Sequence, residues 1–385
     1  MKLHRFGPTV AIAMTAGLVL AACGDDNPTA APQAEGQEQD QADSSAEGTE
    51  DAAAGGEELS GDVKASGASS QESAMTAWIA GYQAVQPGVT VQYDSIGSGG
   101  GRENLIAGAT DFAGSDAYLD EEEQAEVTQF CGPGGAINIP VYISPISIAF
   151  NLPGIQELNL DAPTIAKIFR KEITRWDDPA IAAQNPGVEL PDAPITPVAR
   201  ADDSGTTENF TDYLHTVAPE VWTDEEDGGW PDTLSTERAQ GNAGVVAVVS
   251  QTEGAVTYAD DSLVDESLGK AKIKIGDDYV GVSGQTAATA VGASARVEGT
   301  GQHDIALDID RTPEVDGAYP VVLVSYHIYC TSYTDPQTLK LAKTFGHYVV
   351  SPEGQQLAAE AVKSAPLPAN LTTEAHAALN SIALR

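Results

Sequence analysis

The segment of residues 200–206, Arg-Ala-Asp-Asp-Ser-Gly-Thr, places a guanidinium, a glycine and two hydroxyls directly ahead of a predicted helix. The helix is predicted because apolar residues recur at the spacing of one helical face over residues 210–217. Ser204 can cap this helix, and the free N–H groups of its first turn, together with Arg200, are suited to an oxyanion. The same residues also fit a capped surface helix without a ligand, so this segment alone leaves both interpretations open.

Three other segments have a similar character, and they comprise residues 67–72, 97–101 and 114–116. In the first, Ser69 and Glu72 have the spacing of a capping box ahead of an amphipathic helix over residues 75–82. In the second, glycines around Ser98 follow a predicted strand and would let a ligand approach the backbone. Each segment by itself is also typical of an ordinary loop, and none contains the Gly-Lys-Ser/Thr of a nucleotide-binding loop.

The chain begins with a pattern typical of exported bacterial proteins. A short basic start precedes an apolar run over residues 10–20, which is too short to span a membrane, and then Leu-Ala-Ala-Cys at residues 20–23. We expect a lipoprotein signal peptide over residues 1–22, cleaved ahead of a diacylated, palmitate-bearing Cys23. An ordinary secretory signal with an accidental cysteine is the alternative. Because no later segment is apolar enough to cross a bilayer, the lipid would be the only anchor of an extracytoplasmic protein at the cell membrane.

Residues 23–58 are expected to form an acidic, disordered tether that starts at the lipidated cysteine. Residues 24–58 contain eleven acids and no lysine or arginine, so they cannot bury a core. The whole chain has 57 acidic and 19 basic residues, which gives a formal net charge of −38. A surface of this charge repels nucleic acid and anionic lipid, and neither is expected as a partner.

The remaining residues, 59–385, are long enough for two domains and show a mixed α/β pattern. Alternation predicts a strand over residues 89–93, and long apolar runs predict buried strands over residues 137–151 and 319–329. Helical patterns cover residues 164–169, 210–217, 336–350 and 352–361. Strands that alternate with helices predict mainly parallel sheets.

Three cysteines are present, and lipidation of Cys23 would leave Cys131 and Cys330 as an even pair outside the cytoplasm. Each of the two lies beside one of the long predicted strands, so we expect a disulfide between neighbouring strands. Two free thiols or a metal-binding pair are the alternatives. The six histidines are scattered along the sequence and do not form a metal-binding pattern.

Taken together and in order, these segments resemble a known family, the phosphate-binding lipoproteins of bacterial phosphate ABC transporters. The resemblance extends from Leu59 to the C-terminus. It rests on Gly-Ser-Gly-Gly at 97–100, Ala-Gly-Ser-Asp-Ala at 113–117, Trp-Asp-Asp-Pro at 176–179, Asn-Pro-Gly at 185–187, the segment 200–206, Gly-Ala-Val-Thr-Tyr at 254–258 and Tyr-Pro at 319–320.

The resemblance implies an α/β fold of the type II periplasmic-binding-protein class, a two-domain clamp in which each domain has a mainly parallel sheet flanked by helices. Two hinge strands would join domain I, residues 59–150 plus 319–385, to domain II, residues 151–318. The implied function is that of a lipid-anchored receptor, which binds inorganic phosphate between the domains and delivers it to an ABC permease and its ATPase for import. We expect a monomer without cofactor, metal or enzymatic activity.

The resemblance also implies which residues hold phosphate, namely Ser69, Ser70, Ser98, Asp116, Arg200, Ser204, Gly205 and Thr206, with Asp202 supporting Arg200. Ser69 and Ser70 stand where the family usually has threonine and phenylalanine, and Asp203 replaces a common glycine. We expect the Asp203 side chain to point away from the pocket. The Asp116 carboxylate, by contrast, should accept the O–H of phosphate, which sulfate lacks.

The residues leave two other functions open. A phosphate-sensing or adhesive surface lipoprotein could use the same fold and the same anion-binding segments. A phosphoester hydrolase could use Ser98 or Ser204 as its nucleophile. However, neither serine lies in a Gly-x-Ser-x-Gly turn, and neither has an evident histidine partner.

Overall fold

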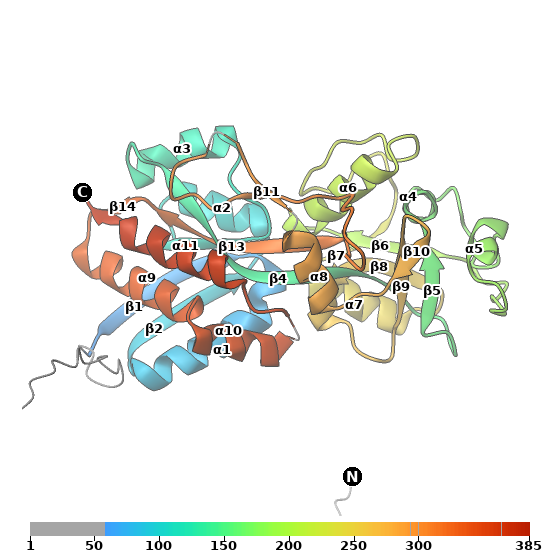
Figure 1. Ribbon diagram of the computed structural model, residues 1–385, viewed down its shortest axis with the longest axis horizontal. Helices are drawn as coiled ribbons and strands as arrows, with labels where there is room; N and C mark the ends of the chain where they lie inside the picture. Colours follow the sequence, from blue (N-terminus) through green and yellow to red (C-terminus); the bar gives the residue numbers. More distant parts are fainter. Residues whose placement is uncertain (1–57, 293, 299, 363) are drawn as a thin grey trace, which may run out of the picture. The chain divides into compact units, whose positions relative to one another are not determined.

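The computed structural model describes residues 58–385, apart from residues 293, 299 and 363. The expected signal peptide, Cys23 and the expected tether up to residue 57 lie outside the described residues. Within the described part, no helix combines the length and the apolar character that a membrane crossing requires. Figure 1 shows how the helices and strands of this part are arranged.

Strands and helices alternate along most of the chain, as the α/β class predicted. The strands are β1 (Ser60–Gly67), β2 (Gly88–Ser95), β3 (Phe112–Ser115), β4 (Ala136–Phe150), β5 (Glu157–Leu160), β6 (Thr196–Arg200), β7 (Glu237–Ala239), β8 (Ala255–Asp260), β9 (Gly269–Ile275), β10 (Asp278–Val280), β11 (Ala295–Arg296), β12 (Leu307–Asp308), β13 (Val322–Cys330), β14 (Ser332–Tyr333) and β15 (Ala383–Leu384). The α-helices are α1 (Glu72–Val85), α2 (Ser98–Ile106), α3 (Glu121–Cys131), α4 (Ala162–Phe169), α5 (Pro179–Gln184), α6 (Gly205–Val217), α7 (Gly241–Gln251), α8 (Gly284–Gly292), α9 (Pro336–Val349), α10 (Pro352–Val362) and α11 (Ala369–Ser381). Two short 3-10 helices are η1 (Ser69–Gln71) and η2 (Asp261–Leu263).

One mixed sheet runs through the described part of the chain. Its strand order is β2-β1-β3-β13-β4-β8-β6-β7, and β9 joins it at β4 and pairs with β5 and β10. We call β1–β3 with α1–α3 and α9–α11 the first lobe, and β5–β10 with α4–α7 the second lobe (Figure 1). In the first lobe β1 is parallel to β2 and β3, and in the second β6 is parallel to β7 and β8. The long strands β4 and β13 add the main antiparallel ladders.

The strands β4 and β13 run between the two lobes (Figure 1). Residues 136–145 of β4 pair with β13, whereas residues 146–150 pair with β8 of the second lobe. Both strands are buried along their whole length, which explains their nearly continuous apolar sequences. The two long predicted strands are therefore confirmed. The second begins only at Val322, because Tyr319 turns toward α8 and its N–H donates to Thr286 O.

The parallel strands deliver the candidate segments to the region where the lobes meet. β1, β3 and β6 end at Gly67, Ser115 and Arg200, and the segments 67–72, 114–116 and 200–206 begin at or next to these ends. In open α/β sheets, ligands bind outside the carboxyl ends of the strands. A hydrogen bond from Asn209 of α6 to Asp116 O, which follows β3, shows that these ends face each other across the lobes.

Helices cover both faces of the sheet. In the first lobe α2 and α3 lie on one face, and α1, α9 and α10 lie on the other, while α6 and α7 lie on opposite faces of the second lobe (Figure 1). Trp78, Trp176 and Trp222 are fully buried in the apolar core between these layers. The segments at the strand ends therefore start from a closely packed frame.

The segment with β11 and β12 packs on the first lobe, although it follows the second-lobe strands in the sequence. Arg296 of β11 forms an ion pair with Glu374 of α11 in the first lobe. Asp304 accepts hydrogen bonds from the Asn138 N–H of β4 at 3.1 Å and from its side-chain amide at 3.0 Å. The Leu307 N–H donates to the Tyr326 hydroxyl at 3.1 Å. The domain boundaries expected from the sequence stay a prediction, since part of residues 151–318 contacts the first lobe.

A disulfide joins Cys131 at the end of α3 to Cys330 at the end of β13. The expected pairing is thereby confirmed, although the bond joins a helix to a strand and not two neighbouring strands. The alternatives of free thiols or a metal-binding pair do not apply to these cysteines. The two residues are 199 positions apart in the sequence. The bond therefore fixes one end of β13 to the first lobe.

Replacing both cysteines, Cys131→Ala with Cys330→Ala, is expected to lower the free energy of unfolding by about 2–5 kcal/mol, since the bond restricts a long loop of the unfolded chain. Guanidinium unfolding of the variant and of the oxidised wild type measures the difference. Wild type treated with reductant is the control and should match the double variant. Equal stability of the double variant and the oxidised protein would contradict this account.

Candidate functional site

Four helical segments begin at the candidate site, each shortly after a strand. η1 begins at Ser69, α2 at Ser98, α6 at Gly205 and α7 at Gly241. Contacts join these starts across the lobes, since the Asn242 N–H of α7 donates to Ser69 Oγ at 3.1 Å. The first N–H groups of a helix lack partners within it and carry the positive end of its dipole. Such a group of helix starts favours an anion.

Arg200 provides the positive charge of the site. It ends β6 and is 1% exposed. Its Nε donates to Asp202 Oδ1 at 2.9 Å, and its Nη2 donates to Asp202 Oδ2. Asp202 Oδ1 also accepts the Gly241 N–H at 2.9 Å, which fixes the carboxylate relative to α7. The remaining nitrogen, Nη1, is buried and has no hydrogen-bond partner among the described residues.

Asp116 is the negative group of the site and lies directly after β3. Its Oδ1 accepts hydrogen bonds from the hydroxyls of Ser70 at 2.6 Å and Ser325 at 2.5 Å, and its Oδ2 accepts one from Thr206 at 3.3 Å. Burial raises the pKa of this carboxyl, whereas the hydrogen bonds from Ser325 and Ser70, the charge of Arg200 and the Thr206 bond lower it. Asp116 therefore receives donors from both lobes and from β13.

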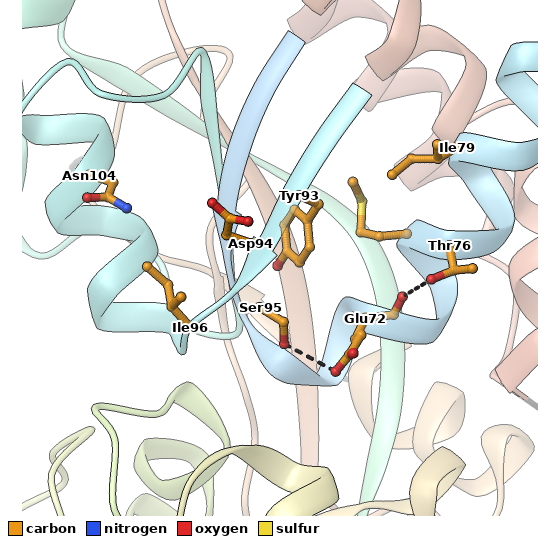
Figure 2. A pocket seen from close by; sticks show the side chains of 9 residues that line it. Glu72, Thr76, Ile79, Tyr93, Asp94, Ser95, Ile96 and Asn104 are labelled. Atoms are coloured by element: carbon orange, nitrogen blue, oxygen red, sulfur yellow. Dashed lines mark hydrogen bonds between the residues drawn. The ribbon is translucent and has the colours of Figure 1, made fainter. Parts of the chain in front are cut away.

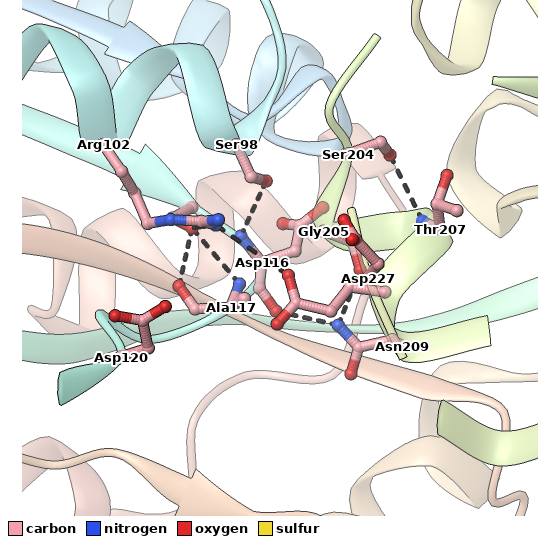
Figure 3. A network of polar contacts seen from close by, with 12 residues as sticks. Ser98, Arg102, Asp116, Ala117, Asp120, Ser204, Gly205, Thr207, Asn209 and Asp227 are labelled. Carbon is pink, nitrogen blue, oxygen red and sulfur yellow. Dashed lines mark hydrogen bonds and ion pairs between the residues drawn. The ribbon is translucent and has the colours of Figure 1, made fainter. Parts of the chain in front are cut away.

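Gly205 allows the lobes to approach closely. A Cβ atom at this position would lie 2.6 Å from Asp116 Cβ and 2.8 Å from Ser98 Oγ. Ser98 Oγ in turn accepts the Asp116 N–H at 3.1 Å (Figure 3). The start of α6 thus rests against both residues of the first lobe, and only glycine leaves room for this contact.

The hydroxyl of Ser204 caps α6, as expected from the sequence. Its Oγ accepts the Thr207 N–H at 3.2 Å (Figure 3). The Tyr258 hydroxyl lies 2.8 Å from Thr207 Oγ1 and accepts the Arg200 N–H at 3.2 Å. These bonds connect the cap of α6 to the end of β6, so that Arg200 and the first turn of α6 keep a fixed relative position.

Ser69 and Glu72 have the spacing of a capping box but do not form one. Ser69 starts a 3-10 turn, and its Oγ accepts from both the N–H and the side-chain amide of Asn242, each at 3.1 Å. The Glu72 carboxylate instead accepts the Ser95 hydroxyl at 3.3 Å, on the wall of a hollow of about 580 Å³ beside β2 (Figure 2). A contact with the other lobe therefore replaces the local cap, and this hollow lies apart from Arg200 and Asp116.

Asp203 occupies space left by two glycines. A Cβ at Gly99 would lie 2.2 Å from Asp203 Cγ, and one at Gly228 would lie 2.1 Å from its Oδ1. Burial raises the pKa of Asp203, and the charge of Arg102 lowers it. The carboxylate thus lies against the first turn of α2, where the absence of side chains accommodates it.

The structure brings most of the expected residues together, and it adds three that the sequence analysis missed. Asn242 donates to Thr206 Oγ1 at 3.2 Å, and Asn209 donates to Asp116 O and Gly205 O, each at 2.8 Å (Figure 3). Ser325 donates to Asp116 from β13. Of these three, only Ser325 had a usable signal in the sequence, as a serine within an otherwise apolar buried strand.

Arg311 is a fourth missed residue, and it positions Asn209 without reaching the centre of the site. Its Nη2 donates to Asn209 Oδ1 at 2.6 Å, so the Asn209 amide N–H groups must face Asp116 and Gly205. Its Nη1 donates to the carbonyls of Pro320 at 3.0 Å and Val322 at 2.8 Å, at the start of β13. Arg311 thereby connects α6 to one of the two strands between the lobes.

The site combines a buried cationic donor, Arg200, with several helix N-termini and with one carboxylate, Asp116, that accepts hydrogen bonds. The donors fit a small tetrahedral oxyanion. The carboxylate fits such an anion only if the anion carries a proton, because two unprotonated oxygens facing each other would repel.

Comparison with known proteins places the sequence among binding proteins. The PBP superfamily domain matches residues 32–353. The chain is 37% identical over 351 residues to phosphate-binding protein PstS 3 of Mycobacterium tuberculosis strain H37Rv, with 90% of each chain covered. It is 33% identical over 393 residues to phosphate-binding protein PstS 2 of the same strain, covering 99% of this chain and 100% of the relative.

Solved structures share the fold. A phosphate-binding protein from Stenotrophomonas maltophilia has a TM-score of 0.66 at 20% identity, covering 82% of this chain and 93% of that one. A high affinity periplasmic phosphate-binding protein, PfluDING, bound with phosphate, has a TM-score of 0.67 at 21% identity, with coverage of 82% and 93%. At these identities the likeness shows the fold alone, and it confirms the two-domain clamp of the periplasmic-binding-protein class.

A second buried carboxylate, Asp260, lies behind the site at the end of β8. It accepts the Ser262 N–H at 2.9 Å and the Tyr142 hydroxyl at 3.3 Å, and its own N–H donates to Asn242 Oδ1 at 3.1 Å. Burial raises its pKa to about 7, with a smaller increase from Asp116, while hydrogen bonds from Ser262 and Ser144 lower it. Between pH 4 and 7 the native state therefore holds a proton that the unfolded chain releases.

Asp260→Asn is expected to reduce the pH dependence of stability, because it removes this titrating group. In the wild type the raised native pKa makes the contribution of Asp260 most favourable at low pH, and this contribution is lost as the pH rises to about 7. Urea unfolding at pH 5 and pH 7.5 measures the change, with the exposed Asp278→Asn as the control. The same decrease in stability in wild type and Asp260→Asn would show that Asp260 does not titrate in this range.

Proposed function

Because this chain belongs to the PBP superfamily and, within it, to the family of the PstS phosphate-binding proteins, we propose that it binds inorganic phosphate between its two lobes. The observation that carries the proposal is the buried Nη1 of Arg200, which has no partner among the described residues. An unpaired buried donor costs free energy, and an oxyanion at this position would remove that cost.

The proposed phosphate contacts come from both lobes, and they are Ser69, Ser70, Ser98, Asp116, Arg200, Ser204, Gly205 and Thr206. Arg200 supplies a charged donor, and Asp202 holds its guanidinium in place. The first turns of α2 and α6 supply N–H groups. The Ser70 hydroxyl already donates to Asp116, so we assign Ser70 a contact through its backbone N–H.

Asp116 would determine which anions the site accepts. A carboxylate next to a dianion is repulsive unless the ligand brings a proton for the carboxylate to accept. Phosphate carries at least one O–H near neutral pH, whereas sulfate carries none. Sulfate would leave the buried carboxylate without a donor at this position, and sites built around such a bond discriminate by roughly 10⁴-fold.

Asp116→Asn is expected to narrow the difference in affinity between phosphate and sulfate, because an amide can donate as well as accept. Calorimetry with phosphate, arsenate and sulfate measures this difference in the unlipidated mature chain. Asp111→Asn, just ahead of β3, is the control. A phosphomonoester added to the same series tests separately whether the protein hydrolyses phosphoesters. Equal rejection of sulfate by wild type and Asp116→Asn, with unchanged phosphate affinity, would remove Asp116 from the site. Phosphate released from the monoester would support a hydrolase.

The proposed motion is closure of two domains about β4 and β13. We assign residues 59–150 plus 319–385 to one domain and residues 151–318 to the other. Support comes from the hydrogen bonds that cross the site, including those from Asn242 to Ser69 and from Thr206 to Asp116. A ligand that contacts both sides favours the closed state by its differential affinity.

Gly205→Ala is expected to prevent full closure, because the new methyl group would overlap Asp116 and Ser98. A loss of phosphate affinity of roughly tenfold or more follows from overpacking of this kind. Solution scattering should show that saturating phosphate contracts the wild type but not the variant. Gly244→Ala on α7 is the matched control, since its nearest neighbour, Ala239 Cβ, is 3.5 Å away. Normal contraction and affinity in Gly205→Ala would contradict the closed arrangement.

The remaining parts of the proposal concern the setting in which phosphate is bound. The N-terminal pattern supports a lipid on Cys23, which would hold a monomeric receptor at the outer side of the cell membrane. The family supports delivery of phosphate to an ABC permease and its ATPase, without an enzymatic step. Mass spectrometry of the N-terminal peptide of the mature protein from the membrane fraction tests the anchor, since an unmodified Cys23 or cleavage at another position would exclude it.

A further inference from the structure

We propose that Ser325 and Gln71 are positioning residues that keep Asp116 as an unprotonated acceptor and thereby set the discrimination between protonated and fully deprotonated tetrahedral anions. The inference rests on the proposed function, in that it assigns a basis for the specificity of the same site. Neither residue is among the expected phosphate contacts, although Gln71 lies within the segment 67–72. Both are 0% exposed, so they act from behind Asp116.

The direction of the Ser325 hydrogen bond follows from its neighbours. Gln71 Nε2 donates to Ser325 Oγ at 2.7 Å, so Ser325 is an acceptor toward Gln71. A serine hydroxyl has a single proton. The carboxylate Oδ1 of Asp116 at 2.5 Å is a nearer and stronger acceptor for it than Ser115 O at 3.4 Å. Ser325 therefore donates to Asp116.

The amide of Gln71 is itself held in one orientation. Its Nε2 also donates to Tyr326 O at 3.0 Å, and its Oε1 lies 3.2 Å from His327 Nε2. A flipped amide would place its oxygen against the Tyr326 carbonyl, with two acceptors facing each other. Burial lowers the pKa of His327 to about 3, so the ring is neutral. With Nε2 protonated, His327 donates to Gln71 Oε1, and its Nδ1 faces the Tyr329 hydroxyl at 3.2 Å.

The two carboxylate oxygens of Asp116 have different numbers of hydrogen-bond donors. Oδ1 receives both Ser70 and Ser325 at short distances, whereas Oδ2 receives only the longer bond from Thr206 among the described residues. Oδ2 is therefore the oxygen with free capacity to accept the O–H of a ligand. A proton on Oδ1 would compete with two fixed donors, so the network favours the ionised carboxylate despite its burial.

Loss of the Ser325 hydroxyl would change the character of Asp116. With one donor fewer at Oδ1, the carboxyl would take up a proton more readily, since the Ser325 bond is the largest of the influences that lower its pKa. A protonated Asp116 can donate to a bare oxygen of sulfate. Discrimination against sulfate should then weaken, most strongly at acid pH.

The test compares Ser325→Ala with Ser147→Ala in the unlipidated mature chain. Ser147 is a matched control, because it is a fully buried serine on β4 whose hydroxyl donates to a different carboxylate, that of Asp261. Calorimetry with phosphate and sulfate at pH 5.5 and pH 8 gives the ratio of affinities. At pH 5.5 the ratio of phosphate to sulfate affinity should be roughly tenfold or more lower in Ser325→Ala than in the wild type, as expected for the loss of a charged hydrogen bond. At pH 8 this difference from the wild type should be smaller.

Two further variants keep the inference open to refutation. Ser325→Thr retains the hydroxyl and should restore the ratio. Gln71→Met removes the donor that directs Ser325, and it should shift the ratio in the same direction as Ser325→Ala by a smaller factor. The proposal would be overturned if Ser325→Ala showed the wild-type ratio of phosphate to sulfate affinity at both pH values. If Ser325→Ala does not fold, the same result in Gln71→Met would overturn it.

A measurement without phosphate separates this inference from the proposed function. Carbon-13 spectra of the labelled carboxyl groups, with Asp116 assigned by its absence in Asp116→Asn, give the titration midpoint of Asp116 directly. Ser325→Ala should raise that midpoint, and Ser147→Ala should leave it unchanged. A chain that binds no phosphate but shows the raised midpoint would refute the function and retain the positioning role. Phosphate binding by the wild type together with an unchanged midpoint in Ser325→Ala would retain the proposed function and refute the positioning role.

Discussion

Burying a carboxylate costs free energy unless donors surround it, and this constraint governs how the two lobes meet. Asp116 is 3% exposed, and its donors come from three distant parts of the chain. Ser70 follows β1, Ser325 lies on β13 and Thr206 belongs to the first turn of α6. Because neither lobe supplies all three, the charge has its full set of donors only when the lobes are in contact. The carboxylate that we propose as a ligand contact therefore also holds the two lobes together.

A strongly acidic protein can hold an anion because this site acts at short range. A formal net charge of −38 repels anions at a distance, but physiological salt screens exposed charges beyond about 8 Å. Within the site the charge of Arg200 is opposed by the carboxylates of Asp202 and Asp116, so these groups together carry no net positive charge. Helix starts and a directed guanidinium supply the attraction locally. The acidic surface should therefore slow the approach of the ligand more than it weakens binding.

Local chemistry made much of the fold predictable, whereas long-range contacts hid part of the site. The cap of α6 by Ser204 and the strands β4 and β13 follow from patterns within a few neighbouring residues. Ser325 contacts Asp116, which lies 209 positions earlier in the chain, and Asn242 contacts Ser69, which lies 173 positions earlier. No local pattern encodes contacts over such distances. The capping-box spacing of Ser69 and Glu72 was uninformative for the same reason, since Asn242 of the other lobe donates to the Ser69 hydroxyl. A polar residue inside an otherwise apolar strand was the one usable signal.

The position of β13 in the sheet determines the order in which the two lobes can finish folding. It lies between β3 and β4, yet it follows the second lobe in the sequence. As the chain is synthesised from its N-terminus, the second-lobe strands can pair with one another before residues 322–330 exist. Until then β3 has an unpaired edge, and Cys131 has no partner. Because pairing over such sequence distances is slow, the lobe whose residues appear first should be the last to finish folding.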